Sequence, residues 1–339
     1  MMKDKKSDFV AVASAGKGSP TTLWRSFNEP VLVKASTRKE IDRAVRKLGY
    51  IRNRAAQTIH GIRSGTVGLI VPTVDNAIFA ELIQSFTDAI ERMGFTILLA
   101  SHGYDLQREY ALARKMLEHR VDGMALIGTE HEAETLHLLT RQGIPSVLLW
   151  SYAQETVFPS IGADNLEVGH LVGHHIGQLG HSEVAMLFPP LTGNDRAAHR
   201  RQGVEDALAQ FDVRVPKHRQ LETPYSVSDA KDAVDRLIEE GNAPTALICG
   251  NDVLAWGALH ALSRRGLRVP EDISVTGIGD FKGSRAFEPA LTTVRIPANQ
   301  IGAKAAGMIA ERIMASQETS SGELVRPELM IRDTSAPPR

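Results

Sequence analysis

The chain is poor in the residues and motifs that would point to a disulfide-rich, membrane or catalytic protein. Its 339 residues include one cysteine, Cys249, so no intramolecular disulfide can form and buried cores must supply the stability. No run of 18 or more apolar residues is present, which leaves no candidate membrane span. A phosphate-binding loop, a nucleophile elbow and a paired-carboxylate pattern are also missing, so we do not expect an enzyme.

The net charge of −1 conceals two segments of opposite charge. Residues 1–65 carry 14 Lys and Arg against 5 Asp and Glu, a net charge of +9, whereas the rest of the chain carries −10. A chain of 339 residues is also expected to comprise two or three domains. A basic surface is often only solvated, but positive charge confined to one small segment indicates a polyanionic partner.

The N-terminus leaves an exported protein open as an alternative. Basic residues precede the apolar stretch 9–13 and an Ala-x-Ala pattern, as they do in a signal peptide. The stretch is shorter than the 7–15 residues that are usual in a signal peptide, and Asp8 adjoins it. We therefore expect a cytoplasmic protein. The alternative is an exported periplasmic solute-binding protein for a sugar transporter, which would be cleaved after Ala15.

Three short amphipathic helices are predicted in the basic segment. The first ends at Gly16, which is expected to cap it. The second begins at Ser19 and Pro20, a typical N-cap and first helical residue, and the third begins at Ser36. The apolar residues expected to face inward are Leu23, Phe27, Ile41, Val45 and Leu48. Short helices joined by a glycine-containing turn are typical of a helix-turn-helix DNA-binding domain.

This segment resembles the DNA-binding head of the LacI/GalR family, the lac-repressor family. The resemblance rests on SPTTLWRSFN at 19–28, on Thr37 and Arg38, and on LGYIRNR at 48–54, and it continues over nearly the whole chain. It implies a homodimeric transcriptional regulator, a repressor in the family's usual mode, with double-stranded operator DNA as its partner. A small sugar or sugar-acid effector would change its affinity for the operator.

The resemblance assigns DNA contacts to the head. Pro20, Thr21 and Arg25 would read base edges in the major groove, where Arg25 can make a bidentate contact to guanine or contact phosphate only. The residues that would contact the DNA backbone are Thr22, Asn28, Lys34, Ser36 and Thr37.

Residues 53–65 are expected to form a hinge between the head and the body. The helix-forming part begins at the cap Asn53 and is too short to be stable alone in water, so it should order on DNA or against a second copy. By resemblance, Ile59 would wedge between base pairs in the minor groove, with Ala56 beside it and Arg54 reaching into the groove. Ile59 could instead be an ordinary linker residue.

Beyond residue 65 the pattern alternates between apolar strands and amphipathic helices. Strands are expected at 66–72, 95–101, 122–128, 144–150, 182–188, 246–250 and 273–278 and from Thr292. Helices are expected at 79–94, 108–121, 131–143, 166–180, 195–211, 251–266 and 300–315. This alternation predicts parallel sheets covered by helices on both faces.

The expected fold class is α/β. It comprises a small all-α helix-turn-helix head at 1–52, the hinge at 53–65 and a bilobed body at 66–339 built on two doubly wound parallel sheets. We expect lobe 1 at about 66–160 with 281–298 as the crossing, and lobe 2 at about 161–280 and 299–335. The resemblance implies a body like a periplasmic binding protein, dimerising through the helices at 79–93 and 106–121.

The effector is expected between the lobes, at the carboxyl ends of the strands. Arg200 lies in an R-x-x-G pattern that resembles the family's effector anchor, whereas Asp280 comes one residue later than the family's usual aspartate. The candidate effector-binding residues are Asp75, Asn76, Phe79, His102, Asp164, Arg200, Asn251, Asp252 and Asp280.

The cations near this cleft favour a sugar acid, such as gluconate, over a neutral sugar. The segments 74–82 and 101–105 also resemble the gluconate-repressor branch of the family. Arg196, Arg201 and Lys282 are nevertheless expected to be surface charges.

Twelve histidines raise the question of a metal site. His170 and His174 are four residues apart on one predicted helix, as metal ligands can be, but nothing nearby completes a zinc set. His181 ends a segment that resembles part of the family's scaffold. We therefore expect structural histidines and neither a metal nor a cofactor.

Overall fold

The computed structural model describes residues 9–51, 63–75, 77–315 and 321–339. The chain divides into two compact units, Met1–Ser64 and Gly65–Arg339. Among the described residues, no helix is both long enough and apolar enough to span a bilayer.

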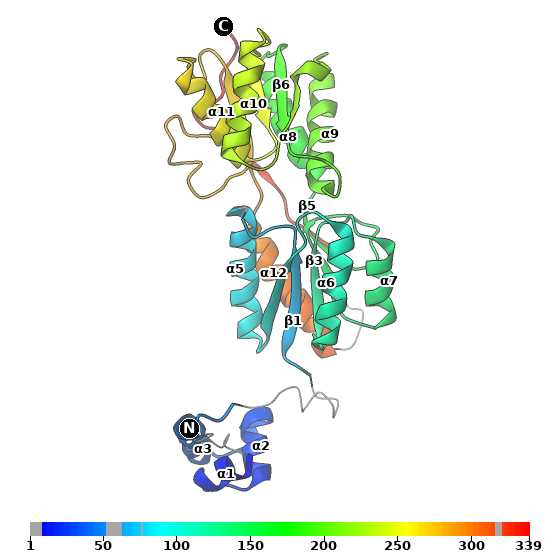
Figure 1. Cartoon of the computed structure of the whole chain (residues 1–339), viewed down its shortest axis with the longest axis vertical. Helices are drawn as coiled ribbons and strands as arrows, with labels where there is room; N and C mark the ends of the chain where they lie inside the picture. Colours follow the sequence, from blue (N-terminus) through cyan, green and yellow to red (C-terminus); the bar gives the residue numbers. More distant parts are fainter. Residues whose placement is uncertain (1–8, 52–62, 76, 316–320) are drawn as a thin grey trace, which may run out of the picture. The chain divides into compact units, whose positions relative to one another are not determined.

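The first unit is a small helical head. Its elements are α1 (Phe9–Ala15), α2 (Pro20–Asn28), the 3₁₀ turn η1 (Pro30–Leu32) and α3 (Ala35–Leu48) (Figure 1). Val12, Ala13, Leu23 and Ile41 are buried between the helices. The predicted inner residues Phe27, Val45 and Leu48 pack against this core, so the expected amphipathic pattern is confirmed.

The turn between α1 and α2 differs in detail from the prediction. Lys17, not Gly16, takes the left-handed conformation, with φ of 54°. The N–H of Gly18 then donates to the carbonyl of Ala13 at 2.9 Å and closes the turn. Gly16 is needed for another reason, because a Cβ there would lie 3.0 Å from the Ile41 side chain. The glycine therefore permits the close approach of α1 and α3.

The first sheet of the second unit is parallel throughout. Its strand order is β11-β5-β4-β3-β1-β2. The strands are β1 (Thr66–Val71), β2 (Thr96–Ser101), β3 (Gly123–Ile127), β4 (Ser146–Ser151), β5 (Ser160–Ala163) and β11 (Glu323–Leu324). The helices that flank it are α5 (Ala77–Arg92), α6 (Leu106–Glu118), α7 (Ala133–Arg141) and α12 (Ala298–Ala315). These elements form lobe 1.

The second sheet has the order β12-β10-β9-β8-β6-β7, and only β12 among its described strands runs antiparallel to its neighbour. The strands are β6 (Val184–Phe188), β7 (Gln220–Glu222), β8 (Ala246–Cys249), β9 (Ser274–Gly279), β10 (Thr292–Arg295) and β12 (Glu328–Met330). The helical elements are α8 (Asn165–Gln178), α9 (Asp195–Ala209), η2 (Lys217–Arg219), α10 (Val227–Glu239) and α11 (Asp252–Arg264). These elements form lobe 2.

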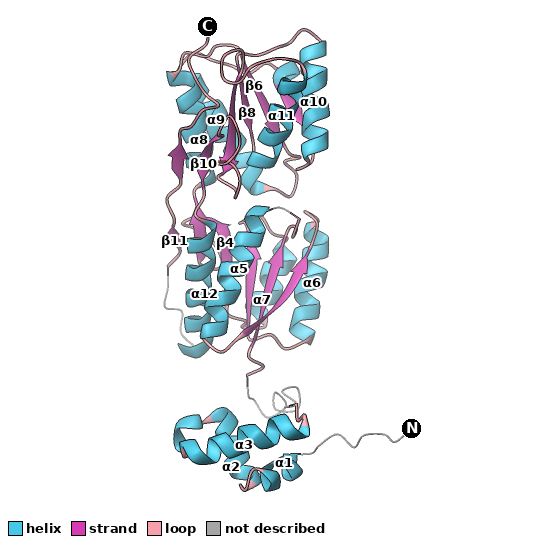
Figure 2. Ribbon diagram, turned by 90° about the vertical axis from the view of Figure 1, so that its left-hand side faces the viewer, coloured by secondary structure: helices cyan, strands magenta, loops and turns pink. Residues whose placement is uncertain are grey.

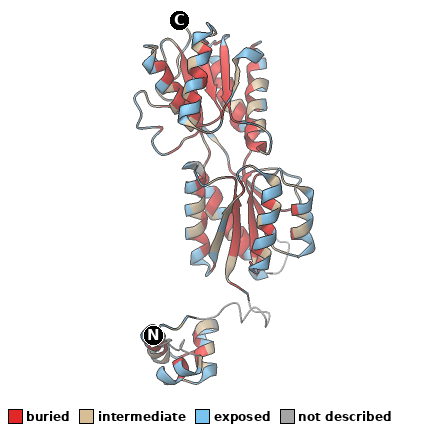
Figure 3. Cartoon of the chain, viewed as in Figure 1, coloured by how far each residue is buried: buried red, intermediate tan, exposed pale blue. Residues whose placement is uncertain are grey.

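Each sheet is buried on both faces, as the strand-helix alternation predicts. In β1, Leu69 faces the core shared with α5 and α12, whereas Ile70 faces the core shared with α6 and α7. In lobe 2, Ile248 packs toward α8 and α9 and Leu247 toward α10 and α11. Figures 2 and 3 show both sheets as buried layers between helices.

The chain crosses between the lobes three times. The crossings run from β5 to α8, from β10 to α12 and from β11 to β12. The expected assignment of the C-terminal part is therefore wrong. The last helix, α12, packs on α5 and the first sheet, because its apolar side chains Ile301, Ile309 and Ile313 join the core of lobe 1. Conversely, β10 pairs with β9 in lobe 2.

Glycines let helices α8 and α9 touch along their backbones. A Cβ at Gly169 of α8 would lie 1.9 Å from the carbonyl oxygen of Arg200 on α9. A Cβ at Gly203 of α9 would lie 2.1 Å from the carbonyl oxygen of Leu166. This close approach sets the position of Arg200.

We expect Gly169→Ala to lower the free energy of unfolding by about 1–3 kcal/mol, because the added methyl forces the two helices apart. Gly307→Ala in α12 is the matched control, since its Cβ would meet only Met93, at 3.9 Å. That control should stabilise by about 0.5–1 kcal/mol through helix propensity. Chemical denaturation measures both changes, and equal effects at the two glycines would contradict the close-packing argument.

Candidate functional site

A small cavity lies between the two lobes of the second unit. Its lining residues are Phe79, Tyr104, Trp150, Arg196, Arg200, Tyr225, Asn251 and Phe281. Phe79 and Trp150 come from lobe 1, whereas Arg196, Arg200 and Asn251 come from lobe 2. Three of the predicted effector residues, Phe79, Arg200 and Asn251, are thus brought together. The cavity is small in this arrangement of the lobes.

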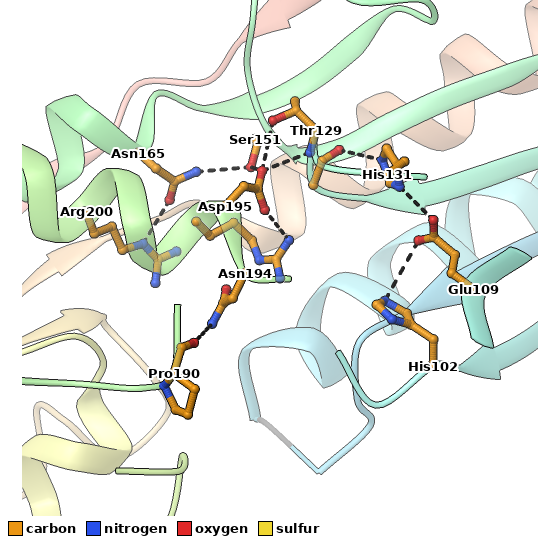
Figure 4. Close-up of polar contacts among 12 residues, drawn as sticks. His102, Glu109, Thr129, His131, Ser151, Asn165, Pro190, Asn194, Asp195 and Arg200 are labelled. Atoms are coloured by element: carbon orange, nitrogen blue, oxygen red, sulfur yellow. Dashed lines mark hydrogen bonds and ion pairs between the residues drawn. The ribbon is translucent and has the colours of Figure 1, made fainter. Parts of the chain in front are cut away.

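Arg200 is held by neutral groups rather than by a carboxylate. It is 5% exposed, and its Nε donates to Oδ1 of Asn165 at 2.8 Å. The Nδ2 of Asn165 donates in turn to the hydroxyl of Ser151 at 3.2 Å (Figure 4). Burial lowers the pKa of the Arg200 guanidinium. Arg200 is therefore a cation fixed in place by hydrogen bonds to the neutral groups of Asn165 and Gly250.

Asp195 ties lobe 2 to lobe 1. Its Oδ2 accepts hydrogen bonds from the N–H and the hydroxyl of Thr129, both at 2.9 Å, and from the hydroxyl of Ser151 at 3.2 Å. Its Oδ1 accepts from Nη1 of Arg196 at 2.6 Å. Thr129 follows β3 and Ser151 ends β4, so one carboxylate at the start of α9 joins two strand ends of the other lobe (Figure 4).

The electrostatics of this contact keep Asp195 ionised. Burial by itself would raise the pKa of Asp195, but the Arg196 guanidinium and the hydrogen bonds from Thr129 hold that pKa below its ordinary value. The contact is therefore fully formed at neutral pH and weakens only when acid protonates the carboxylate.

Arg196 was expected at the surface, and this expectation is wrong. It is 5% exposed because the first turn of α9 faces the cavity. Its guanidinium carbon lies 6.0 Å from the centre of the Tyr104 ring. Lys282 is exposed, as expected, and Arg201 is partly exposed and pairs with Glu205.

Four aromatic lining residues were not predicted from the sequence: Tyr104, Trp150, Tyr225 and Phe281. Phe79 meets Trp150 edge-on with ring centres 5.6 Å apart, and the rings of Tyr104 and Tyr225 lie 6.1 Å apart. Tyr104 and Trp150 also have positive φ values, 63° and 78°. Such backbone conformations are uncommon outside glycine and gather at functional sites. The available signal was position, since Trp150 is the last large apolar residue of β4 and Tyr104 lies just after the end of β2.

Three predicted aspartates have structural partners instead of a place in the cavity wall. Asp252 is fully buried and accepts from the N–H of Phe281 and from the hydroxyls of Ser284 and Thr293 at 2.6–2.8 Å. Burial raises its pKa, and the two hydroxyls oppose that rise. Asp280 pairs with arginines of β10 and the C-terminal segment, Arg295 and Arg332. Asp164 caps the N-terminus of α8.

Two further predicted effector residues, Asp75 and His102, do not line the cavity. Asp75 is exposed, and Asn76 lies outside the described residues. His102 is 2% exposed and lies beside the buried Glu109, with 3.9 Å between Nε2 and Oε2. Glu109 also contacts Nδ1 of His131 at 2.8 Å. Burial lowers the pKa of His102 although Glu109 opposes this. His102 thus belongs to a buried cluster of lobe 1.

Three further histidines, His170, His174 and His181, contact other protein groups. His181 contacts the Thr245 hydroxyl and the Ala336 carbonyl, both at 2.9 Å, which ties the C-terminal segment to lobe 2. His170 and His174 stack on each other with ring centres 5.6 Å apart. Within the described ranges, no group of three or more His, Cys, Asp or Glu is arranged to hold a metal ion.

In the head, the residues expected to read bases are accessible. Pro20, Thr21 and Arg25 are exposed on α2, and the Ser19 hydroxyl caps this helix by accepting from the N–H of Thr22 at 3.1 Å. Lys34 and Ser36 are exposed, Thr22 and Thr37 are half-buried, and Asn28 is the last residue of α2. The hinge residues Asn53, Arg54, Ala56 and Ile59 lie outside the described residues.

We expect Asp195→Asn to loosen the contact between the lobes. The substitution removes the charge paired with Arg196 and weakens the bonds to Thr129 and Ser151, which should cost about 1–3 kcal/mol. Hydrogen exchange at the Thr129 amide should quicken at neutral pH, and the wild type should approach the variant only as pH falls below the ordinary Asp value of 3.8. Asp206→Asn, at an exposed position of the same helix, is the control. Unchanged exchange at Thr129 would rule out this role for Asp195.

Comparison with known proteins places this geometry in context. Residues 174–335 match the family model of the periplasmic binding protein-like domain. The chain is 29% identical over 327 residues to the HTH-type transcriptional repressor PurR of Klebsiella pneumoniae subsp. pneumoniae, and the match covers 96% of each chain.

Two solved structures extend the comparison. The lac repressor dimer bound to operator and an anti-inducer has the same fold, with a TM-score of 0.85, 24% identity and coverage of 98% of this chain and all of that one. A LacI family transcriptional regulator from Mycobacterium smegmatis is 30% identical, with a TM-score of 0.68, and the match covers 80% of this chain and all of that one. With a helix-turn-helix head, two doubly wound lobes and this level of identity, the chain belongs to the LacI family of transcriptional regulators.

Proposed function

We propose that the protein is a homodimeric repressor of transcription whose affinity for operator DNA changes when a small sugar or sugar acid binds between the lobes. The observation that carries this proposal is the presence in one chain of a helix-turn-helix head and a bilobed body with a cavity between its lobes. Its relatives bear names that fit this role, since PurR is a transcriptional repressor and the lac repressor structure is an operator-bound dimer. A cytoplasmic location follows from that role.

The head supplies the chemistry for DNA. Residues 1–65 carry a net charge of +9, which favours association with phosphates. The second helix of a helix-turn-helix places its first turns against base edges, and Thr21 and Arg25 are exposed there on α2. An approximately palindromic operator requires two copies of the head, which fits a homodimer. Dimerisation through the faces of α5 and α6 is part of this proposal.

An exported solute-binding protein fits less well. The apolar stretch that resembles a signal peptide lies in α1, where Val12 and Ala13 are buried in the core of the head. A relative that matches along 96% of this chain is a transcriptional repressor. The stretch therefore has a role in the folded head.

Coupling between the two units would pass through residues 53–65. The last residue of this segment is attached to lobe 1, because the N–H of Gly65 donates to Asp122 at 2.6 Å. An effector that changes the separation of the lobes would therefore also move the end of the hinge. We propose that the hinge segments of two subunits pair on DNA, with Ile59 wedged in the minor groove, and separate when the lobes rearrange. Membership of the gluconate-repressor branch stays a prediction.

DNA binding should weaken steeply with salt, because Lys and Arg that contact phosphates release counterions. Arg25→Ala should weaken binding of the chain's own upstream DNA by about 1–3 kcal/mol, roughly fivefold to 150-fold, if Arg25 reads guanine. A uniform loss across DNA sequences with a shallower salt slope would indicate a phosphate contact instead. Fluorescence anisotropy over a salt series measures both quantities.

Arg214→Ala, at an exposed position in lobe 2, is the control for that experiment and should leave the affinity unchanged. A flat salt response in the wild type would contradict the proposed DNA binding.

Arg200→Ala should abolish the response of operator affinity to the effector. A thermal-shift screen of sugars and sugar acids first identifies compounds that raise the melting temperature of the wild type. Anisotropy with the strongest of these then compares the wild type, Arg200→Ala and Arg201→Ala, a partly exposed neighbour on the same helix. A normal response in Arg200→Ala would show that another residue anchors the ligand.

A further inference from the structure

The wall of the interlobe cavity is rich in hydrogen-bond donors and poor in acceptors. Arg196, Arg200 and the amide of Asn251 supply donors, and the hydroxyls of Tyr104 and Tyr225 can supply two more. Among the described residues that line the cavity, none carries a carboxylate. A neutral sugar presents many hydroxyl donors and needs acceptors opposite them. This wall suits a ligand that is itself rich in acceptors.

Two of these donors are buried without a partner in the described part of the chain. They are Nη2 of Arg196 and Nδ2 of Asn251, on side chains that are 5% and 2% exposed. A buried donor that lacks a partner costs roughly 1–3 kcal/mol. A ligand that brings acceptor atoms into the cavity would remove that cost at both positions.

The charges of the wall do not balance. Asp195 pairs with Nη1 of Arg196, and its second oxygen is occupied by Thr129 and Ser151. Arg200 donates to the neutral groups of Asn165 and Gly250. Two buried guanidiniums therefore share one carboxylate, which leaves one positive charge in the closed cavity. An unpaired buried charge is costly, and an anion relieves that cost.

The close approach of Gly128 fixes the orientation of the Arg196 guanidinium. Gly128 has a φ of 96°, and a Cβ there would lie 2.4 Å from Nη1 of Arg196. This close approach brings Nη1 against Asp195, while the guanidinium is positioned over the Tyr104 ring at 6.0 Å. The remaining Nη2 is the atom left to meet a ligand.

We propose that the effector is a small organic anion, a carboxylate or a phosphate ester, and that Arg196 is the residue that selects it over its neutral analogue. This proposal rests on the proposed effector-regulated function. Arg200, one turn further along α9, binds ligand oxygens from the same wall of the cavity. Phe79 and Trp150 supply the apolar surface against which a carbon skeleton packs. Arg196 is thus a specificity-determining residue, separate in role from Arg200.

Matched pairs of compounds test this proposal on the full-length protein. The carboxylate pairs are D-gluconate with D-sorbitol and D-glucuronate with D-glucose, and D-glucose 6-phosphate with D-glucose provides the phosphate arm. Differential scanning fluorimetry at constant ionic strength measures the rise in melting temperature. We expect at least one anion to raise it clearly while its neutral partner does not, and the arm that responds distinguishes carboxylate from phosphate.

Variants then connect the selectivity to Arg196. Arg196→Met keeps an unbranched, flexible side chain but shortens it and removes its charge. It should weaken binding of the anion at least tenfold with little change in binding of the neutral partner. Arg196→Lys should restore part of the preference. Arg201→Met, at a partly exposed position on the same helix, should leave it unchanged. Because the readout is the ratio of two affinities in each variant, a general loss of stability does not imitate it.

The outcomes separate this proposal from the proposed function. If a neutral sugar raises the melting temperature and alters DNA binding as strongly as its acid, the protein is effector-regulated but the anion proposal fails. The proposal also fails if Arg196→Met folds and keeps the preference. If Arg196→Met does not fold, the proposal is tested by two other measurements. These are the preference of the wild type for each anion over its neutral partner, and the part of that preference that Arg196→Lys retains. If no anion in the set acts, the anion proposal is overturned, and salt-dependent operator binding still tests the DNA-binding function by itself.

Discussion

The carboxylate of Asp195 is the interaction on which the closed arrangement of the body depends. It receives three hydrogen bonds from the ends of two strands in lobe 1, although it starts a helix of lobe 2. The same group orients Arg196, which lines the cavity next to it. One buried side chain therefore contributes both to the contact between the lobes and to the shape of the cavity wall. Any ligand that changes the surroundings of Arg196 also acts on the contact between the lobes.

The fold was largely predictable because its signals are local. Apolar runs of strand length alternate with amphipathic helices, and residues such as Ser19, Asn251 and Gly49 mark helix ends through their own backbone preferences. The same local signals could not assign α12 to a lobe, since an apolar helix fits either sheet and only the packing of Ile301 and Ile309 decides. The short helix α10 was missed, although its cap Ser226 and the spacing of Val234 and Leu237 indicate it.

The site was less predictable, for electrostatic reasons. Asp252 and Asp280 lie where a ligand-binding aspartate was expected, but Thr293, Ser284 and two arginines satisfy these carboxylates. Whether a polar residue binds a ligand or another part of the protein depends on its neighbours in space, which here lie 15 to 52 residues away along the chain. The prediction for Arg196 was wrong in the opposite direction, because it was expected at the surface and lines the cavity. An arginine followed four and five residues later by Arg200 and Arg201 suggests a surface position in the sequence, yet Asp195 pairs with Arg196 and Gly128 leaves space for its guanidinium in the interior.

The three crossings between the lobes have a consequence for how the chain folds during synthesis. The head needs only residues up to Tyr50 for its core and can fold as soon as they emerge. Lobe 1 has no such independence, because α12 and β11 complete it and both come after nearly all of lobe 2. Until then, the apolar face of the first sheet that α12 covers stays open. The nascent chain thus carries a finished DNA-binding head well before it carries a finished sensor.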